Sequence, residues 1–215
     1  MKRIIFFVLL FTLTCSIPFH GFAQTSEKPD TMEINKDSFY AGEIYQIPST
    51  DVEHNLFLIG STVKNNADIG KDVFALGNNY TQSGTIQGNS FIVGNKIWIE
   101  GNVQGDVFVI GNIVEISPKS IIEGNLFVVS STLTMGGSVH GLVQFSGDTL
   151  RFMGTSSDAD INANTIIIED GARIRQLRYN SNAALSVSDD AEIAITELKP
   201  TPIKPEETES PPKKA

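Results

Sequence analysis

A repeat of 17 residues runs through residues 53–150 and constrains the fold more than any other feature of the chain. Its clearest copies begin at Gly88, Gly105 and Gly124, and one copy is lengthened to 19 residues by the insertion Ser117–Ser120. Aligning the copies stacks apolar residues in columns, and a repeat this regular indicates a repeat architecture. The four columns are Phe57, Phe74, Phe91, Phe108, Phe127; Ile59, Leu76, Val93, Ile110, Val129; Val63, Tyr80, Ile97, Val114, Leu133, Leu150; and Ile69, Ile86, Val103, Ile122, Val139.

The residue types within each repeat predict strands and exclude helices. Glycine recurs in every copy, and each glycine costs about 1 kcal/mol inside a helix, whereas Val, Ile, Phe and Thr favour strands. Apolar and polar residues alternate with the period of a strand, as in Lys96–Glu100 and Asn112–Ile116. Gly-Asn and Gly-Asp pairs separate these stretches as corners.

These features predict an all-β protein, a single-stranded parallel β-helix (β-solenoid) with 17–19 residues per coil. Each coil then lies about 4.8 Å above the last, so that like residues stack over like. Propeller blades need about 40 residues, and an up-and-down barrel would show no such register. Because crossovers between parallel strands are right-handed, a right-handed solenoid is expected.

The segments outside the repeats differ from it in composition. Residues 1–23 resemble a secretory signal peptide, with Lys2-Arg3, an apolar run and cleavage after Ala23; lipoprotein processing at Cys15 is the alternative. Residues 24–52 form a polar leader that either stays flexible or caps the first coil. Regular coils are expected over 53–155 and degenerate C-terminal coils over 156–198, where Thr165–Ile174 matches Ala184–Ile193 at a spacing of 19. The Pro- and charge-rich residues 199–215 are expected to be disordered.

Charge and cysteine content limit the partners. Removing residues 1–23 takes away Lys2, Arg3 and no acid, which changes the formal charge from −9 to −11. Such an acidic protein lacks the clustered basic charge that nucleic acids require. Cys15 is the only cysteine, so a processed chain has no disulfide. The signal peptide predicts export to the periplasm or the cell surface.

One strand of each coil is apolar on both of its sides, as in Val107–Ile110. Successive strand residues point to opposite faces, and counting in steps of two from Val103 places Val107 and Val109 inside. The column Phe57, Phe74, Phe91, Phe108 and Phe127 then lies outside as a candidate site for self-association or for a partner. A ladder of this size exceeds the apolar surface that monomers usually expose. The alternative is that residues 24–50 cover it.

Motifs of catalysis and ligand binding are missing from the sequence. There is no Gly-x-Ser-x-Gly elbow, no His-Glu-x-x-His motif and no phosphate-binding loop, so no enzyme activity, cofactor or metal is predicted. His140 lies at a corner and could serve an acyltransferase, but an exposed turn histidine without a role is the simpler interpretation. The stacked column Asp72, Asn89, Asp106 and Asn125 offers oxygens for calcium, yet an Asx side chain at a corner is expected to satisfy its own backbone. Trp98 points outward and is a weak indication of sugar binding.

The residue pattern of the repeats, clearest over Ile99–Asn112, resembles that of the bactofilin family of polymer-forming cytoskeletal proteins. The resemblance covers about residues 55–154. It implies a right-handed β-helix that assembles end to end into non-polar filaments without nucleotide and that scaffolds envelope proteins. The signal peptide sets this chain apart from typical cytosolic bactofilins and is similar to that of exported relatives.

Two hypotheses of function follow, with a third behind them. The first is a non-enzymatic exported structural protein that self-associates or scaffolds cell-envelope components. The alternative is a glycan-binding or carbohydrate-active solenoid at the cell surface, which would need carboxylates converging in a groove. The third is the acyltransferase that depends on His140.

Overall fold

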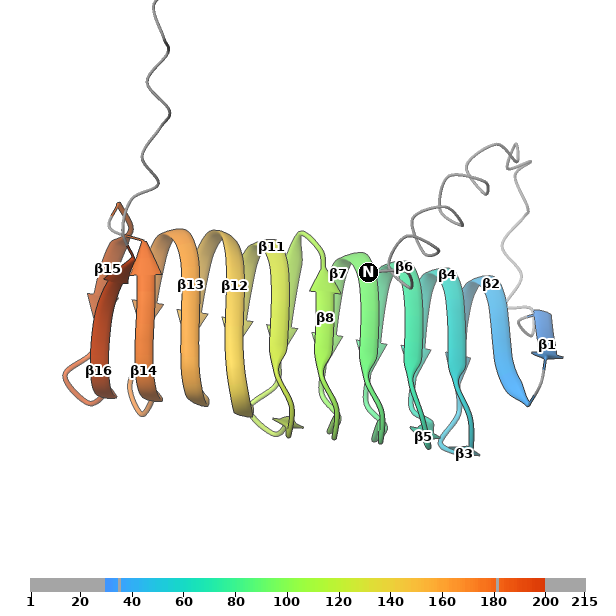
Figure 1. Cartoon of the computed structure of the whole chain (residues 1–215). Coiled ribbons are helices and arrows are strands. Elements are labelled where there is room, and N and C mark those ends of the chain that lie inside the picture. Colours follow the sequence, from blue (N-terminus) through green and yellow to red (C-terminus); the bar gives the residue numbers. More distant parts are fainter. Residues whose placement is uncertain (1–29, 35, 181, 200–215) are drawn as a thin grey trace, which may run out of the picture.

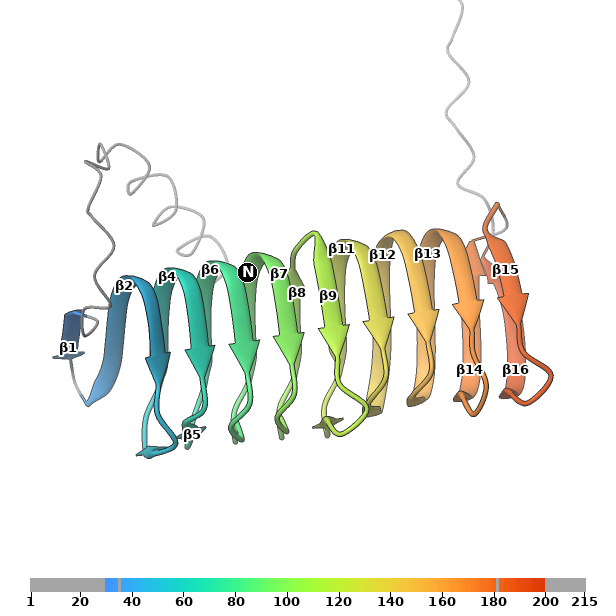
Figure 2. The same ribbon diagram turned by 180° about the vertical axis from the view of Figure 1, so that it is seen from behind.

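The computed structural model describes residues 30–34, 36–180 and 182–199, and this part of the chain contains strands and no helix. The strands wind into a parallel β-solenoid of about nine turns, as Figures 1 and 2 show from opposite sides. The predicted all-β solenoid is confirmed. Across the described residues, no helix is long and apolar enough to cross a membrane.

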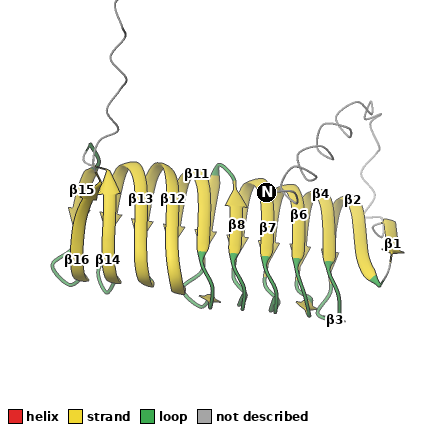
Figure 3. Ribbon diagram, in the orientation of Figure 1, coloured by secondary structure: helices red, strands yellow, loops and turns green. Residues whose placement is uncertain are grey.

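Most coils are built from one long strand that turns a corner, together with a short strand or a single bridge (Figure 3). We name the first half of the long strand face 1, its second half face 2, and the short stretch face 3. The strands that span faces 1 and 2 are β2 (Asp37–Ile47), β4 (Leu56–Asn65), β6 (Val73–Gln82), β7 (Ser90–Ile99), β11 (Leu126–Met135), β12 (Ser138–Phe152) and β13 (Thr155–Ile168). The others are β1 (Asp30–Ile34), β3 (Asp51–Val52), β5 (Asp68–Ile69), β8 (Val107–Ile110), β9 (Ile113–Ile116), β10 (Ile121–Ile122), β14 (Arg173–Asn180), β15 (Ala184–Val187) and β16 (Glu192–Lys199).

The strand register reproduces the columns of the sequence. Phe57 pairs with Phe74, Phe74 with Phe91, Phe91 with Phe108, and Phe108 with Phe127. On face 3, isolated bridges join Ile69, Ile86, Val103 and Ile122 in order. The insertion Ser117–Ser120 lies between β9 and β10, at a corner where extra residues break no ladder.

Alternation along the strands divides core from surface as expected. Val107 and Val109 are 0% and 2% exposed, whereas Phe108 and Ile110 are 36% and 57% exposed. Since alternate strand residues face opposite ways, the whole Phe column lies on the outer side of face 1. The predicted inward position of Val107 and Val109 is confirmed.

The core is mainly apolar, and a cluster of larger polar side chains lies in its N-terminal half. Asn65, Tyr80 and Gln82 are fully buried. The Gln82 side-chain oxygen accepts hydrogen bonds from the Tyr80 hydroxyl at 2.7 Å and from Asn65 Nδ2 at 2.9 Å. Gln82 Nε2 donates to the carbonyl oxygen of Gly84 at 2.9 Å, so every member of the cluster has a partner. Burial of the Tyr80 hydroxyl in this cluster raises its pKa above the usual range.

The stack begins one coil earlier than the expected boundary at residue 53. Strand β2 pairs in parallel with β4 and places Phe39 in register with Phe57. Residues 37–52 therefore form a coil of the stack, in the segment 24–52 for which the sequence analysis considered a polar leader or an N-terminal cap. The expected signal peptide, its cleavage after Ala23 and the expected disordered tail beyond Lys199 lie outside the described residues.

The C-terminal coils keep the predicted register with a more polar sequence. Thr165 pairs with Ala184 and Ile174 with Ile193, at the spacing of 19 that the sequence indicated. Between β12 and β13 the spacing shortens by one residue at an irregularity between Val139 and Leu142. The axis of the stack nevertheless continues without interruption (Figure 1).

Candidate assembly surfaces

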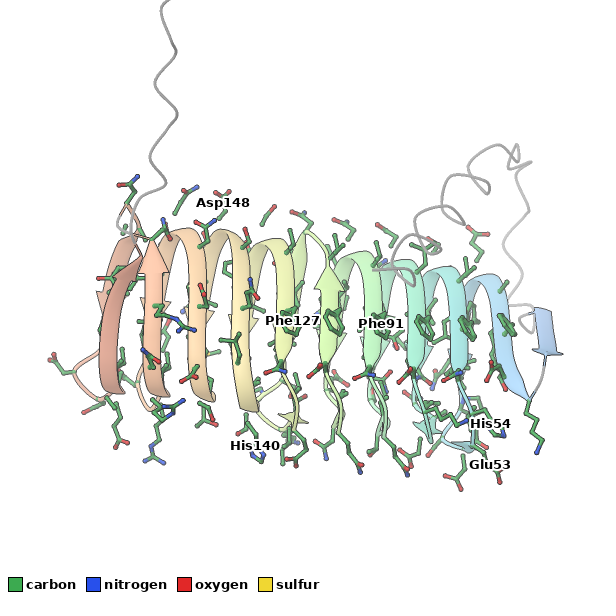
Figure 4. All side chains as sticks on the ribbon, viewed as in Figure 1. Glu53, His54, Phe91, Phe127, His140 and Asp148 are labelled. Atoms are coloured by element: carbon green, nitrogen blue, oxygen red, sulfur yellow. The ribbon has the colours of Figure 1, made fainter. Side chains whose placement is uncertain are left out.

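A column of stacked phenylalanine rings is the main feature of face 1, and Figure 4 labels Phe91 and Phe127 on it. Neighbouring rings lie 4.4–5.0 Å apart between centroids, with interplanar angles of 2–8°. This spacing is close to the distance between paired strands, so the backbone register alone places the rings face over face. We call the six residues the Phe ladder: Phe39, Phe57, Phe74, Phe91, Phe108 and Phe127.

A second apolar column runs beside the Phe ladder and is more exposed. Most of the rings are half-buried, because the inner members of the ladder are covered above and below by their neighbours. The column two residues further along each strand has no such cover, and Ile59, Ile110 and Val129 are 55–57% exposed. The two columns together form an apolar strip up the first six coils. Residues 37–50, part of the segment 24–50 that was considered as its cover, instead contribute Phe39 to it.

The apolar strip ends where the last coils begin. In the register of face 1, Phe127 is followed by Gln144, Asp160 and Arg178. The neighbouring column changes in the same way from Val129 to Ser146 and Asn162. The same backbone surface is therefore apolar at the N-terminal end of the solenoid and polar at the C-terminal end, so the strip is a feature of the sequence and not of the fold.

A ladder of Asp and Asn side chains runs parallel to the Phe ladder, two residues before it in each coil. Each side-chain Oδ1 accepts a hydrogen bond from the backbone N–H of the equivalent residue in the next coil, at 2.7–3.1 Å. We call it the Asx ladder: Asp37, Asn55, Asp72, Asn89, Asp106 and Asn125, the last of which bonds to Leu142. The stacking of this column was predicted, but the expectation that each side chain satisfies its own backbone is wrong, because the acceptor serves the coil above.

The Asx ladder explains the glycine that precedes it. A Cβ atom at Gly105 would lie 2.6 Å from Asn89 Oδ1, and one at Gly124 would lie 2.5 Å from Asp106 Oδ1. The side chain from the coil below occupies the space that a larger residue would need. Glycine therefore fits the ladder without a clash in the coils that begin at Gly105 and Gly124, whereas His54 and Lys71 hold the equivalent position in two earlier coils.

Charged and neutral members alternate strictly along the Asx ladder. Asn89 Nδ2 also lies 3.3 Å from Asp72 Oδ1, and Asn125 Nδ2 donates to Asp106 Oδ1 at 3.0 Å. Asn55 and Asn89 thus each separate two carboxylates, which would lie one strand spacing, about 4.8 Å, apart if they were in neighbouring coils. Like charges at that distance repel, so the alternation stabilises the stack. Because the oxygens accept backbone N–H groups, they are poorly placed to bind a calcium ion.

The two histidines of the described residues lie at separate places along the stack (Figure 4). His140 Nδ1 lies 2.5 Å from the carboxylate of Glu123, and both side chains are more than half exposed. The nearby hydroxyl of Ser157 donates to the carbonyl oxygen of His140 and not to its imidazole. His54 Nε2 is buried and has no hydrogen-bond partner among the described residues. Neither histidine forms a pair with a nucleophile in this part of the chain.

Ionisable side chains on the surface of the last coils are engaged with one another. Arg151 bonds to Glu169 at 2.6 Å and Arg175 to Asp158 at 2.5 Å, each across neighbouring coils. Within the described residues, no group of three or more His, Cys, Asp or Glu side chains could hold a metal ion. Trp98 is half-buried and points outward between the buried Ile97 and Ile99, as expected.

Residues 75–176 match the family model described as Bactofilin: Polymer-forming cytoskeletal. This part of the stack matches the bactofilin domain. The resemblance inferred from the repeats is thereby confirmed, and the family is a structural, polymer-forming one. Neither the curated proteins nor the solved structures contained a significant match to the chain.

The bactofilin domain includes three members of the Phe ladder, and the ladder continues beyond it toward the N-terminus. Sequence reasoning missed Phe39, Asp37 and Asn55 as members of the two ladders. The signal that could have found them is a pattern of Asp or Asn two residues before Phe, which occurs once in each of six successive coils. It reads Asp37-Ser38-Phe39 in the first coil and Asp106-Val107-Phe108 in the fifth.

Proposed function

We propose that this protein is an exported, non-enzymatic structural protein whose bactofilin coils self-associate and scaffold components of the cell envelope. The observation that carries the proposal is the apolar strip on a domain of a polymer-forming family. Self-association is what that family does. The outer face of this chain offers an apolar contact surface, and its ladders hold that surface rigid.

The size and chemistry of the apolar strip support a contact role. Six strands at about 4.8 Å give it a height of roughly 24 Å. Both of its columns consist of Phe, Ile, Leu and Val over most of that height, and the monomer leaves Ile59, Ile110 and Val129 more than half exposed. Contiguous apolar surfaces of this extent mark interaction sites in soluble proteins. A rigid strip also loses little conformational entropy on binding.

The proposal includes the absence of catalysis. Two observations support it: the matched family is a structural one, and the polar side chains bond to neighbouring coils. The Asx oxygens serve backbone N–H groups, and Arg151, Arg173 and Arg175 of the last coils pair with acids across neighbouring coils. These contacts stabilise the stack. Polar side chains that bond to neighbouring coils in this way hold the stack together, as expected for a scaffold.

Substitution of Ile110 by Lys is expected to weaken self-association about tenfold or more, because it places a charge among the exposed apolar side chains of the strip. Ile110 is 57% exposed, so the folded monomer tolerates the change. Sedimentation velocity over a concentration series of the purified protein measures the effect.

The matched control is Asn162→Lys, which adds the same charge in the same column three coils further on. Asn162 lies on the polar part of face 1, so the control is expected to associate like the wild type. Equal association of both variants and the wild type would remove the apolar strip as a contact surface. A wild type that stays monomeric at all concentrations would overturn self-association itself.

Export predicts a mature N-terminus at Gln24. When the chain is expressed with its own N-terminus in a Gram-negative host, intact-mass measurement of the purified protein should show the loss of residues 1–23. Cell fractionation should place it outside the cytoplasm. An uncleaved chain in the cytoplasmic fraction would contradict export and leave the assembly proposal to its own test.

A further inference from the structure

An open groove of about 720 Å³ lies on face 3 over the sixth to ninth coils. It extends from His140 in the sixth coil, labelled in Figure 4, to Ala194 in the ninth. The polar lining between these two residues consists of Thr155, Ser156, Ser157, Arg173, Arg175 and Glu192. The apolar strip lies on face 1, so the groove is a second and separate surface.

The groove begins at the β-bulge between the sixth and seventh coils. There the register shifts, and His140 and Gly141 lie opposite the single residue Ser157. The Ser157 hydroxyl donates to the carbonyl oxygen of His140 and holds the bulge in place. A bulge bends its strand and redirects side chains, and bulges are common next to functional sites. This irregularity sets the coils of the groove apart from the regular ones.

One hydroxyl in the lining of the groove has no partner. Ser156 is 8% exposed, and its Oγ makes no hydrogen bond among the described residues. It stands in an inward column of face 3 that has Val139 in the coil before and Ile174 in the coil after. A buried hydroxyl without a partner costs stability, and an ordered water or a ligand can satisfy it. A polar residue thus interrupts an apolar column at the groove.

Two arginines of the eighth coil form the cationic side of the groove. The side chains of Arg173 and Arg175 are 66% and 61% exposed and lie on either side of the buried Ile174. Arg175 Nη2 contacts Asp158 at 2.5 Å, and Arg173 Nε contacts Glu192 at 3.0 Å. Because a guanidinium carries five N–H donors, each arginine can bind a further acceptor while it keeps its partner in the neighbouring coil.

The outward positions of face 3 change in charge along the stack. Those of the first two coils carry the acids Asp51, Glu53 and Asp68, and those of the next two are uncharged, with Thr85, Gln87, Asn102 and Gln104. Positive charge comes to this face with Arg173 and Arg175. An anion is therefore repelled from the N-terminal end of face 3 and attracted to the groove.

We propose that the groove binds an acidic glycan, a chain of sugars with carboxylate groups that lies along the axis of the stack. The guanidinium groups bind the carboxylates through paired N–H donors. The hydroxyls of Thr155 and Ser157 donate to Ser138 and His140 of the coil before, so their lone pairs accept hydrogen bonds from sugar hydroxyls. Binding on face 3 does not require self-association through face 1.

The shape and the lining of the groove favour an acidic polymer over a small or neutral ligand. Its length from the sixth to the ninth coil is three strand spacings, roughly 14 Å. Small-molecule sites usually enclose about 70–90% of the ligand surface, whereas an open groove suits a chain that makes repeated contacts. No aromatic ring is among the described residues that line it. A neutral sugar therefore finds no stacking surface, and charge-assisted bonds to arginine have to supply the affinity.

Isothermal titration calorimetry of the purified protein with oligogalacturonate tests the proposal. Arg173→Gln and Arg175→Gln are each expected to weaken binding about tenfold, because each removes a charged donor to the carboxylates. The matched control is Arg151→Gln. Arg151 also pairs with an acid of the neighbouring coil, Glu169, but it lies on face 2, outside the groove. Its substitution is expected to leave the affinity unchanged.

Substitution of Asp158 by Asn is expected to change the affinity in the opposite direction. Asp158 competes with the ligand for Arg175, so its neutralisation should strengthen the binding of oligogalacturonate about threefold. An arginine with a purely structural role would give no such gain. Unchanged or weaker binding by Asp158→Asn would contradict direct contact between Arg175 and the ligand.

Two further probes decide the class of ligand. A neutral oligosaccharide of the same length and polyglutamate are each expected to bind at least about tenfold more weakly than oligogalacturonate. Equal binding of polyglutamate would overturn the glycan and assign the groove to acidic peptides. Absence of oligogalacturonate binding, or equal affinities of Arg175→Gln and Arg151→Gln, would overturn the groove as a site.

The outcome is independent of the self-association proposed above. Ile110→Lys lies on face 1 and is expected to bind oligogalacturonate like the wild type, although it associates more weakly. Arg175→Gln is expected to sediment like the wild type in the absence of glycan. Failure of one proposal therefore leaves the measurement of the other unchanged.

Discussion

Substitution of Gln82 by Leu is expected to lower the free energy of unfolding by about 3 kcal/mol, because buried donors lose their acceptor. Gln82 Oε1 is the acceptor for both the Tyr80 hydroxyl and Asn65 Nδ2, and all three side chains are fully buried. Leucine fits the volume but accepts no hydrogen bond. Urea denaturation followed by circular dichroism measures the loss.

Gln144→Leu is the matched control for this prediction. Gln144 is exposed on face 1, so the same chemical change there is expected to alter the free energy of unfolding by less than about 0.5 kcal/mol. If Gln82→Leu proved as stable as the control, the hydrogen bonds of the buried cluster would add nothing to the free energy of unfolding beyond what an apolar side chain supplies.

Substitution of Asn89 by Asp is expected to destabilise the protein by about 2 kcal/mol at pH 7, through repulsion within the Asx ladder. The introduced carboxylate would lie between those of Asp72 and Asp106, at one strand spacing from each. It also loses the contact of Asn89 Nδ2 with Asp72 Oδ1. Thermal denaturation at several pH values measures the effect.

The pH dependence of Asn89→Asp follows from the direction in which repulsion shifts the pKa of the introduced carboxyl group. Neighbouring carboxylates raise the pKa of the introduced carboxyl group in the folded state above its unfolded value. The loss of stability is therefore complete above the pKa that the introduced group has in the folded state. It decreases as the pH falls and the group takes up a proton. Asn112→Asp, at an exposed corner outside the Asx ladder, is expected to show no such deficit. A deficit that is independent of pH would exclude charge repulsion as its cause.

The sequence predicted the central coils well because a solenoid converts spacing directly into register. Phe74, Phe91 and Phe108 are one repeat apart in the chain and therefore adjacent in space. The inward side of Val107 followed from simple alternation. The right-handed twist of the coil was inferred from general rules and stays a prediction.

The first coil was missed for a physical reason. Its inward positions on face 1 are Ser38 and Tyr40, where the second coil has Leu56 and Leu58. Because these positions are polar, the first coil lacks the apolar alternation that identified the other coils. In addition, the spacing from Phe39 to Phe57 is one residue longer than the repeat. Only the pairing of β2 with β4 shows that these residues continue the stack.

The role of the Asx ladder could be predicted only in part. Its members could be aligned by spacing, but an Asx side chain at a corner can bond to its own turn or to the next coil with the same residue types. The position of the backbone N–H in the next coil decides which of these two hydrogen bonds forms, and that position depends on the assembled stack. The exposed apolar strip, by contrast, was predictable from the residues of one strand.

The alternation of Asp and Asn doubles the true period of this solenoid. Loss of a single coil would bring Asn55 next to Asn89, or Asp72 next to Asp106, and would leave either two amides or two carboxylates in contact. Loss or duplication of two coils together preserves the sequence of charges. Lengthening or shortening of this chain in evolution is therefore expected to proceed by pairs of coils, so that the number of turns in related proteins changes in steps of two.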